Sequence, residues 1–204
     1  MRESSIADGV AVTEDRSNTR VSFDTSLESE RLLLRPFTTS DFDALYAIQS
    51  RSDVARWLYW GPRSADEVRA ELKKKMQGFT LDHDGDGLSL AIVLKASSEV
   101  IGYGSLILVS AEHRQGELGY VIHPDHQGHG YATETARMLL QLAFHELGLH
   151  RIIGRIEPRN DASARVLERL GMRREAHFVE NEYVKGEWQS EAVYAILDRE
   201  WRAG

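Results

Sequence analysis

The stretch Gln127-Gly128-His129-Gly130-Tyr131-Ala132 has residue types and spacing that suit the binding of an anion. Glycines permit tight turns and let a ligand approach the backbone without an intervening Cβ. A helix that begins just after them would add unpaired N–H groups and the positive end of its dipole. The stretch therefore predicts a cradle for an anion such as a pyrophosphate. It has neither the Gly-Lys-Ser/Thr ending of a Walker A loop nor the G-x-G-x-x-G spacing of a dinucleotide-binding turn.

The elements on either side of this cradle follow from hydrophobic periodicity. Residues 117–122 have the character of a strand, and the segment from Thr133 places its apolar residues on one helical stripe that reaches Leu147. Gly148 is expected to end this helix, and residues 152–156 form a second strand. The βαβ unit should place two parallel strands, joined by a right-handed connection, inside an otherwise antiparallel sheet.

The rest of the chain adds strands and helices without an internal repeat or a second-domain boundary. Helices are expected after Thr39 or Ser40, from Ser64, and from Asn160 or Asp161. Further strands are expected near residues 31–35, 88–94, 100–109, 178–184 and 188–197. The polar, aperiodic residues 1–26 are predicted to be a flexible tail, and residues 27–204 to be one α/β domain.

Composition narrows the class of protein. The chain has 204 residues, of which 42% are hydrophobic and 28% charged, and it lacks the long apolar run of a membrane span. Acidic residues near the N-terminus argue against a signal peptide, so a cytoplasmic location is expected. The absence of cysteine excludes disulfides, thiolate metal sites and a cysteine nucleophile. The net charge of −7 argues against nucleic acid; it suits a cationic substrate, or ordinary solubility alone.

With its flanking elements, the cradle resembles a known signature. Gln127-x-x-Gly130-x-Ala132 is similar to the Q/R-x-x-G-x-G/A motif of the GNAT N-acetyltransferase superfamily. The context also resembles that superfamily: Glu117-Leu118-Gly119-Tyr120 on the preceding strand, Tyr131-Ala132-Thr133-Glu134 at the helix start, and Asn160-x-x-Ser163 followed by Leu170-Gly171-Met172.

Both ends of the domain resemble one branch of this superfamily. The run from Glu30 to Pro36 is similar to the opening of the Rim-type branch, which includes ribosomal-protein N-terminal acetyltransferases. Tyr183-x-Lys185-Gly186 and Trp188 resemble its last hairpin. The resemblance covers about residue 27 to the end.

The resemblance implies a fold and a co-substrate. The fold would be a mixed, mostly antiparallel sheet of about six to seven strands, with helices on both faces. Its parallel pair would splay apart to admit acetyl-CoA, with the pantetheine arm near Ile122 and Asn160 and the pyrophosphate on the cradle. The cofactor-binding residues implied in this way are Ile122, Gln127, Gly128, His129, Gly130, Tyr131, Ala132, Thr133 and Asn160.

The chemistry of acetyl transfer needs a proton acceptor for the amine, a donor for the oxyanion and a partner for the departing thiolate. Glu117 is the candidate base, acting directly or through water; it could instead be a strand glutamate paired with a basic residue. A backbone N–H near Ile122 is the candidate oxyanion donor. Many GNAT enzymes place a tyrosine for the thiolate where this chain has Leu167, whereas Rim-type members often have a serine at the Ser163 position, so the resemblance implies Ser163 as the candidate here. Ser163 could also only bond the backbone in the first helical turn.

Other features have simpler explanations. Residues 82–87 match half of a calcium loop but lack its final glutamate, and the histidines at 123, 126 and 129 cannot align on a helix, so no metal is expected. Trp57, Tyr59 and Trp60 could line an acceptor pocket or belong to the core.

The sequence thus predicts an N-acetyltransferase that moves an acetyl group directly from acetyl-CoA to a primary amine, such as a protein N-terminus. Alternatives are a small-molecule amine acceptor (a polyamine, amino acid or drug) and a non-catalytic acyl-CoA-binding module. The oligomeric state is open, and neither a nucleic acid nor a membrane is expected as a partner.

Overall fold

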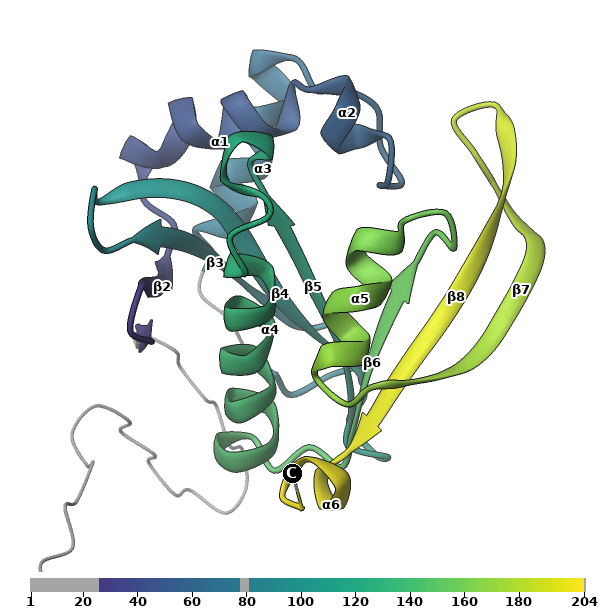
Figure 1. Ribbon diagram of the computed structural model, residues 1–204. Coiled ribbons are helices and arrows are strands. Elements are labelled where there is room, and N and C mark those ends of the chain that lie inside the picture. The colour runs from purple at the N-terminus through teal and green to yellow at the C-terminus, as the bar shows by residue number, and fades with distance from the viewer. Residues whose placement is uncertain (1–25, 78–80, 204) are drawn as a thin grey trace, which may run out of the picture.

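A computed structural model describes residues 26–77 and 81–203, which are built around one eight-stranded sheet (Figure 1). The strand order is β1-β2-β3-β4-β5-β6-β8-β7. The strands are β1 (Leu27–Glu28), β2 (Leu32–Pro36), β3 (Gly87–Leu94), β4 (Glu99–Ser110), β5 (Gln115–Ile122), β6 (Arg151–Ile156), β7 (Arg173–Val184) and β8 (Glu187–Leu197).

All neighbouring strands are antiparallel except β5 and β6, which are parallel. The α/β fold with one parallel pair is therefore confirmed. The sheet has one strand more than the upper end of the expected range. The additional strand is the two-residue β1, where Leu27 pairs with Leu34; a segment this short has no periodicity by which to predict it.

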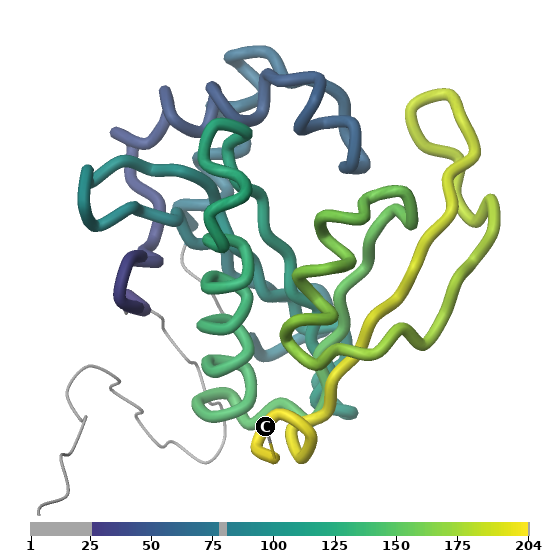
Figure 2. Tube along the Cα trace, in the orientation of Figure 1, coloured from purple at the N-terminus to yellow at the C-terminus, as the bar shows by residue number. Residues whose placement is uncertain are grey.

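Helices cover both faces of the sheet, as expected. The helical segments are η1 (Thr39–Asp41), α1 (Phe42–Gln49), α2 (Ser52–Ala55), α3 (Ala65–Lys75), η2 (Pro124–His126), α4 (Tyr131–Gln141), η3 (Leu142–Glu146), α5 (Asp161–Arg169) and α6 (Asp198–Trp201). Figure 2 shows α4 and α5 on one face of the sheet and α1 and α3 on the other. The larger core lies between the sheet and α4 and α5, and a smaller core lies under α1 and α3. The alternation of side chains along β3 divides its residues between the two cores, with Ile92 in the larger and Ala91 in the smaller.

The helix starts show where local prediction succeeds and where it fails. Ser64 and Glu67 form the expected capping box, in which the Glu67 carboxylate accepts the Ser64 N–H at 2.8 Å. The cap expected at Thr39 or Ser40 is wrong. Asp41 accepts the N–H of Thr38 at 2.8 Å and is held by Arg35 at 2.7 Å, so a 3₁₀ turn precedes α1.

The crossover helix begins at Tyr131, as the resemblance implied and two residues before the segment whose periodicity indicated it, and it widens into the π-helical turn η3 before it ends. Gly148 follows with φ +61°, as expected of a residue at a helix end. None of the helices in the two described ranges is long and apolar enough to cross a membrane. The predicted tail, residues 1–26, lies outside the described residues except for Ser26, so the division at residue 27 stays a prediction.

Candidate active site

The sheet opens between its two parallel strands. Hydrogen-bonded pairing of β5 with β6 is confined to residues 115–117 and 151–153. Beyond Glu117 the strands diverge, while β5 remains paired with β4 and β6 with β8 (Figure 1). The expected splay is therefore present, and two cavities open beside the diverging ends.

The first cavity, of about 350 Å³, lies over the predicted anion cradle. Gly128 and Gly130 both have positive φ, at +82° and +84°, which explains why glycine suits both positions. No described atom lies within 4 Å of the position that a Cβ on Gly128 would take, so a ligand has room there. Within the described part of the chain, no side chain caps the first turn of α4, which leaves its N–H groups available to an anion.

The predicted cofactor-binding residues gather around this cavity. Ile122, Gln127, Gly128, Gly130, Tyr131, Ala132, Thr133 and Asn160 all line it. His129 does not; its ring stacks on Tyr131 with the ring centroids 5.7 Å apart. Arg165 and Arg169 of α5 also line the cavity, and sequence reasoning missed them. Their positive charge adds to the suitability of the cavity for a phosphate-bearing ligand.

Arg31, which lies far from the cradle in the sequence, contacts the cradle and holds it in place. Arg31 donates through Nε to Glu134 at 2.8 Å and through Nη1 to the carbonyl oxygen of His129 at 3.0 Å. Its guanidinium carbon also lies 4.8 Å from the centre of the Tyr131 ring. Residues just before β2 thereby fix the cradle and the first turn of α4.

The second cavity, of about 410 Å³, lies between the sheet and the segment that leads from α2 to α3. Trp57, Tyr59 and Trp60 all line it, which favours the pocket interpretation of these aromatic residues. Trp60 also packs against the smaller core, so for this residue both interpretations hold.

Three residues line both cavities: Tyr120 from β5, and Asn160 and Ser163 from the start of α5. Asn160 caps α5, because its Oδ1 accepts the N–H of Ser163 at 3.1 Å. These residues form the junction where a ligand in the cradle cavity could meet a ligand in the second cavity.

Glu117 lies in the second cavity, with a charged partner. Its Oε2 is 3.1 Å from Nε of Arg155, and Nη1 of Arg155 is 3.7 Å from a carboxylate oxygen of the buried Glu191. Burial raises the pKa of Glu117 above the ordinary carboxyl range; the Arg155 charge opposes this shift and Glu191 adds to it. A raised pKa suits a proton acceptor, but the pairing with Arg155 also matches the structural alternative. The base role stays a prediction.

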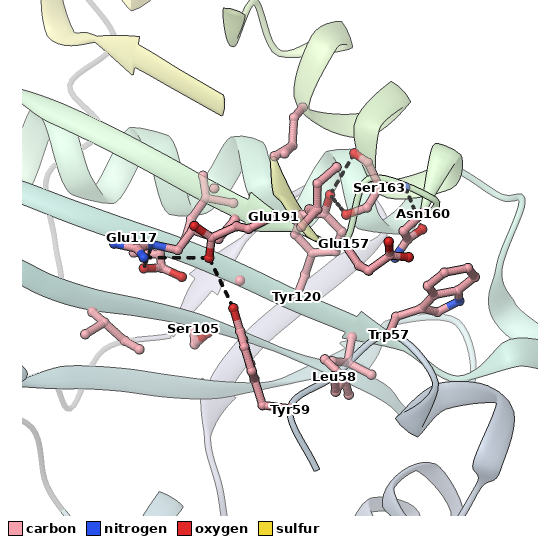
Figure 3. A pocket seen from close by; sticks show the side chains of 18 of the residues that line it. Trp57, Leu58, Tyr59, Ser105, Glu117, Tyr120, Glu157, Asn160, Ser163 and Glu191 are labelled. Atoms are coloured by element: carbon pink, nitrogen blue, oxygen red, sulfur yellow. Dashed lines mark hydrogen bonds and ion pairs between the residues drawn. The ribbon is translucent and has the colours of Figure 1, made fainter. Parts of the chain in front are cut away.

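The hydroxyl of Ser163 bonds to another side chain rather than to the helix backbone. Its Oγ lies 2.9 Å from the hydroxyl of Tyr120, and the same phenol donates to the Ser163 carbonyl oxygen at 3.3 Å (Figure 3). Burial raises the pKa of Tyr120 to about 12, and its hydrogen bond with Ser163 partly offsets that shift. At neutral pH the phenol is therefore protonated, so Tyr120 and Ser163 form a linked pair of donors at the junction.

In this chain, the position where many GNAT enzymes carry a tyrosine is held by Leu167, which is 1% exposed, packs in the larger core and also lines the second cavity. It lies over Gly154, where its Cδ2 would be 3.1 Å from an added Cβ. A leucine has no proton to give, so the tyrosine's role is not filled from this position.

From the sequence, Tyr120 is expected either to orient CoA or to pack in the core. The structure places its phenol against apolar side chains of the larger core and at the junction of the two cavities. Sequence reasoning did not assign Arg155 and Glu191. Arg155 approaches Glu117 through the pairing of β5 with β6, and Glu191 joins them only through the pairing of β6 with β8.

The cradle cavity and the second, acid-lined cavity meet at Tyr120, Asn160 and Ser163, an arrangement that could bring two ligands into contact. Residues 31–173 match the family described as the acetyltransferase (GNAT) domain. The uncharacterized N-acetyltransferase YnaD of Bacillus subtilis (strain 168) is 34% identical over 176 residues, which cover 86% of this chain and 98% of that protein.

Solved structures show the same relationship. The GNAT-family acetyltransferase of Bacillus anthracis has a TM-score of 0.78 and 32% identity, over 86% of this chain and all of that one (100%). Spermidine N-acetyltransferase of Vibrio cholerae, solved in complex with CoA and spermine, has a TM-score of 0.72 and 24% identity, over 85% of this chain and 99% of that one; this likeness shows the fold alone. The chain belongs to the GNAT acetyltransferase family, and its activity is that of an N-acetyltransferase.

Proposed function

We propose that the protein transfers the acetyl group of acetyl-CoA to a primary amine, with CoA in the cradle cavity and the amine in the second cavity. The observation that carries this proposal is the junction at which Tyr120, Asn160 and Ser163 line both cavities. A donor and an acceptor bound on either side would meet there, as direct transfer in a ternary complex requires.

The cradle cavity supports acetyl-CoA as the donor. Its positive-φ glycines, uncapped helix start and two arginines match the pyrophosphate of CoA. The splay between β5 and β6 leaves strand backbone beyond Glu117 unpaired on one side, where the pantetheine amides could bond. Similarity to a relative named a putative ribosomal N-acetyltransferase, YdaF of Bacillus subtilis (28% identical over 177 residues), supports the Rim-type branch as part of this proposal. The opening residues from Glu30 to Pro36 support it as well.

Each step of the transfer would use a different group beside the junction. The amine nitrogen, deprotonated by Glu117 directly or through water, attacks the thioester carbonyl carbon while a backbone N–H near Ile122 stabilises the oxyanion. The carbon–sulfur bond then breaks, and the thiolate accepts a hydrogen bond or a proton from Ser163. The hydrogen bond between the Tyr120 and Ser163 hydroxyls strengthens Ser163 as a donor when the phenol supplies the proton.

Ligand binding gives the first test of the proposal. A ligand that binds only the folded protein stabilises it by about 2.7 kcal/mol at a hundredfold excess over Kd. Saturating CoA or acetyl-CoA should therefore raise the melting temperature, and adenosine alone should raise it much less. If saturating CoA does not raise the melting temperature, the proposal is wrong.

Replacement of the thiolate partner gives the second test. Ser163→Ala should lower kcat by about 10- to 150-fold, the equivalent of one charged hydrogen bond of about 1.5–3 kcal/mol. The KM for acetyl-CoA should stay within a few-fold, because Asn160 keeps the cap of α5. Tyr120→Phe should give a smaller loss, since it removes only the hydroxyl partner of Ser163. An unchanged kcat in Ser163→Ala would contradict this role and mean that water donates to the departing thiolate.

A further inference from the structure

A buried carboxylate beside the junction has no role in the chemistry above. Glu157 follows β6 directly, its side chain is 7% exposed, and it lines the second cavity but not the cradle. Its backbone carbonyl oxygen accepts the N–H of Asn160 at 2.9 Å, so it lies at the base of the helix that forms the junction. Figure 3 shows its carboxylate beside Asn160, on the side toward Trp57.

The two oxygens of this carboxylate have different surroundings. Oε1 lies 2.9 Å from Nε of Arg159, a side chain that is 63% exposed and also approaches Glu187 at 3.8 Å. Oε2 is buried and has no hydrogen-bond partner among the described residues. Buried polar atoms are nearly always hydrogen-bonded, so an unpaired carboxylate oxygen on a cavity wall indicates a ligand that supplies the missing donor.

The charges around the cavity indicate what that donor is. Among the described residues that line it, Glu117, Glu157 and Glu191 are acidic, and Arg155 is the one basic residue. Arg155 is already shared by Glu117 and Glu191, which leaves Glu157 as the cavity-lining carboxylate with a buried oxygen that has no partner among the described residues. A cationic donor is favoured at such a position.

From this arrangement we infer that Glu157 is the residue that recognises the ammonium of the acceptor and orients it at the junction. The inference rests on the proposed function and adds a substrate class to it. The cavity lining carries three acidic side chains and one basic side chain that two of them already share, so it disfavours a carboxylate next to the ammonium and makes free amino acids poor acceptors. Peptide N-termini and alkyl diamines, whose ammonium has no adjacent carboxylate, are the acceptors that fit.

The test uses the full chain saturated with CoA and three probe ligands: alaninamide, alanine and butane-1,4-diamine. Amine binding is measured as the shift in melting temperature, and acetylation as the KM of the amine. Glu157→Gln is compared with Glu187→Gln, a matched control that also contacts Arg159 but does not line the cavity.

We expect alaninamide and the diamine to bind the unaltered protein and the control variant, and alanine to bind at least about tenfold more weakly. Glu157→Gln should raise the KM of the amine by about 10- to 100-fold and leave the KM of acetyl-CoA unchanged, since one charged hydrogen bond is lost. Equal amine binding in both variants, or no binding of any probe to the unaltered protein, would overturn the assignment of Glu157. The proposed function would fail separately, through the absence of a CoA-induced shift.

Discussion

Gly130→Val should abolish measurable binding of CoA while the protein remains folded. Gly130 has φ +84°, a conformation that β-branched residues rarely adopt, and it sits at the start of α4. A Cβ at this position would make only an ordinary contact with Arg31, whose Nη2 would lie 3.5 Å away, so the effect comes from the backbone conformation. The cradle would lose the backbone geometry that presents its N–H groups. Each charged hydrogen bond between a backbone N–H of the cradle and the pyrophosphate is worth about 1.5–3 kcal/mol. The loss of two such bonds should therefore weaken the binding of CoA by more than about a hundredfold.

Gly85→Val is the matched control for this variant. Gly85 has φ +90° and open space around its Cβ position, so it imposes a similar backbone strain outside both cavities. Both variants should lose about 1–3 kcal/mol of stability. Only Gly130→Val should lose its affinity for CoA, which is measured by titration calorimetry. Normal affinity in that variant would mean that the glycine-rich stretch is a turn without a ligand-binding role.

Glu117→Gln should lower the rate of transfer by about 10²- to 10⁴-fold, the usual cost of losing a general base. The affinity for CoA should barely change, because Glu117 does not line the cradle cavity. Burial raises the pKa of Glu117, so the unaltered enzyme should lose activity on acidification at a pH above the ordinary carboxyl range. This acidic limb of the kcat/KM profile should disappear in the glutamine variant.

The stability of this variant separates a base from a structural ion pair. A raised pKa means that the folded protein holds the proton more tightly than the unfolded chain does. Ionisation of Glu117 therefore costs stability above that pKa rather than supplying it. Glu117→Gln should accordingly not lower the melting temperature at neutral pH. A clear drop in stability together with a full kcat would assign Glu117 to the ion pair with Arg155.

Local patterns predicted the parts of the fold that depend on neighbouring residues. The stripe of α4, the strand before it and the glycine-rich turn lie within about 40 residues, so spacing alone indicated the parallel pair and the cradle. The capping box at Ser64 followed for the same reason. The start of α1 could not, because Asp41 is held by Arg35 on a different element.

The acceptor side of the site depends on contacts between distant residues. Tyr59 donates to Glu191 at 3.2 Å across 132 positions of sequence, and Lys185 reaches the carbonyl oxygen of Ala55 at 2.8 Å across 130. Neither hydrophobic periodicity nor a short sequence motif can predict such contacts. The unpaired oxygen of Glu157 is likewise visible only when the cavity wall is assembled.

Transfer of the acetyl group itself tests the account most directly. The protein is incubated with acetyl-CoA and a panel of alkyl diamines and peptides with free N-termini. Released CoA is read with a thiol reagent, to which the cysteine-free chain adds no background, and the product is identified by mass spectrometry. We predict that CoA release requires both the protein and an amine, and that it equals the amount of acetylated amine formed. Binding of CoA without transfer to any amine of the panel would contradict the account and indicate an acyl-CoA-binding module.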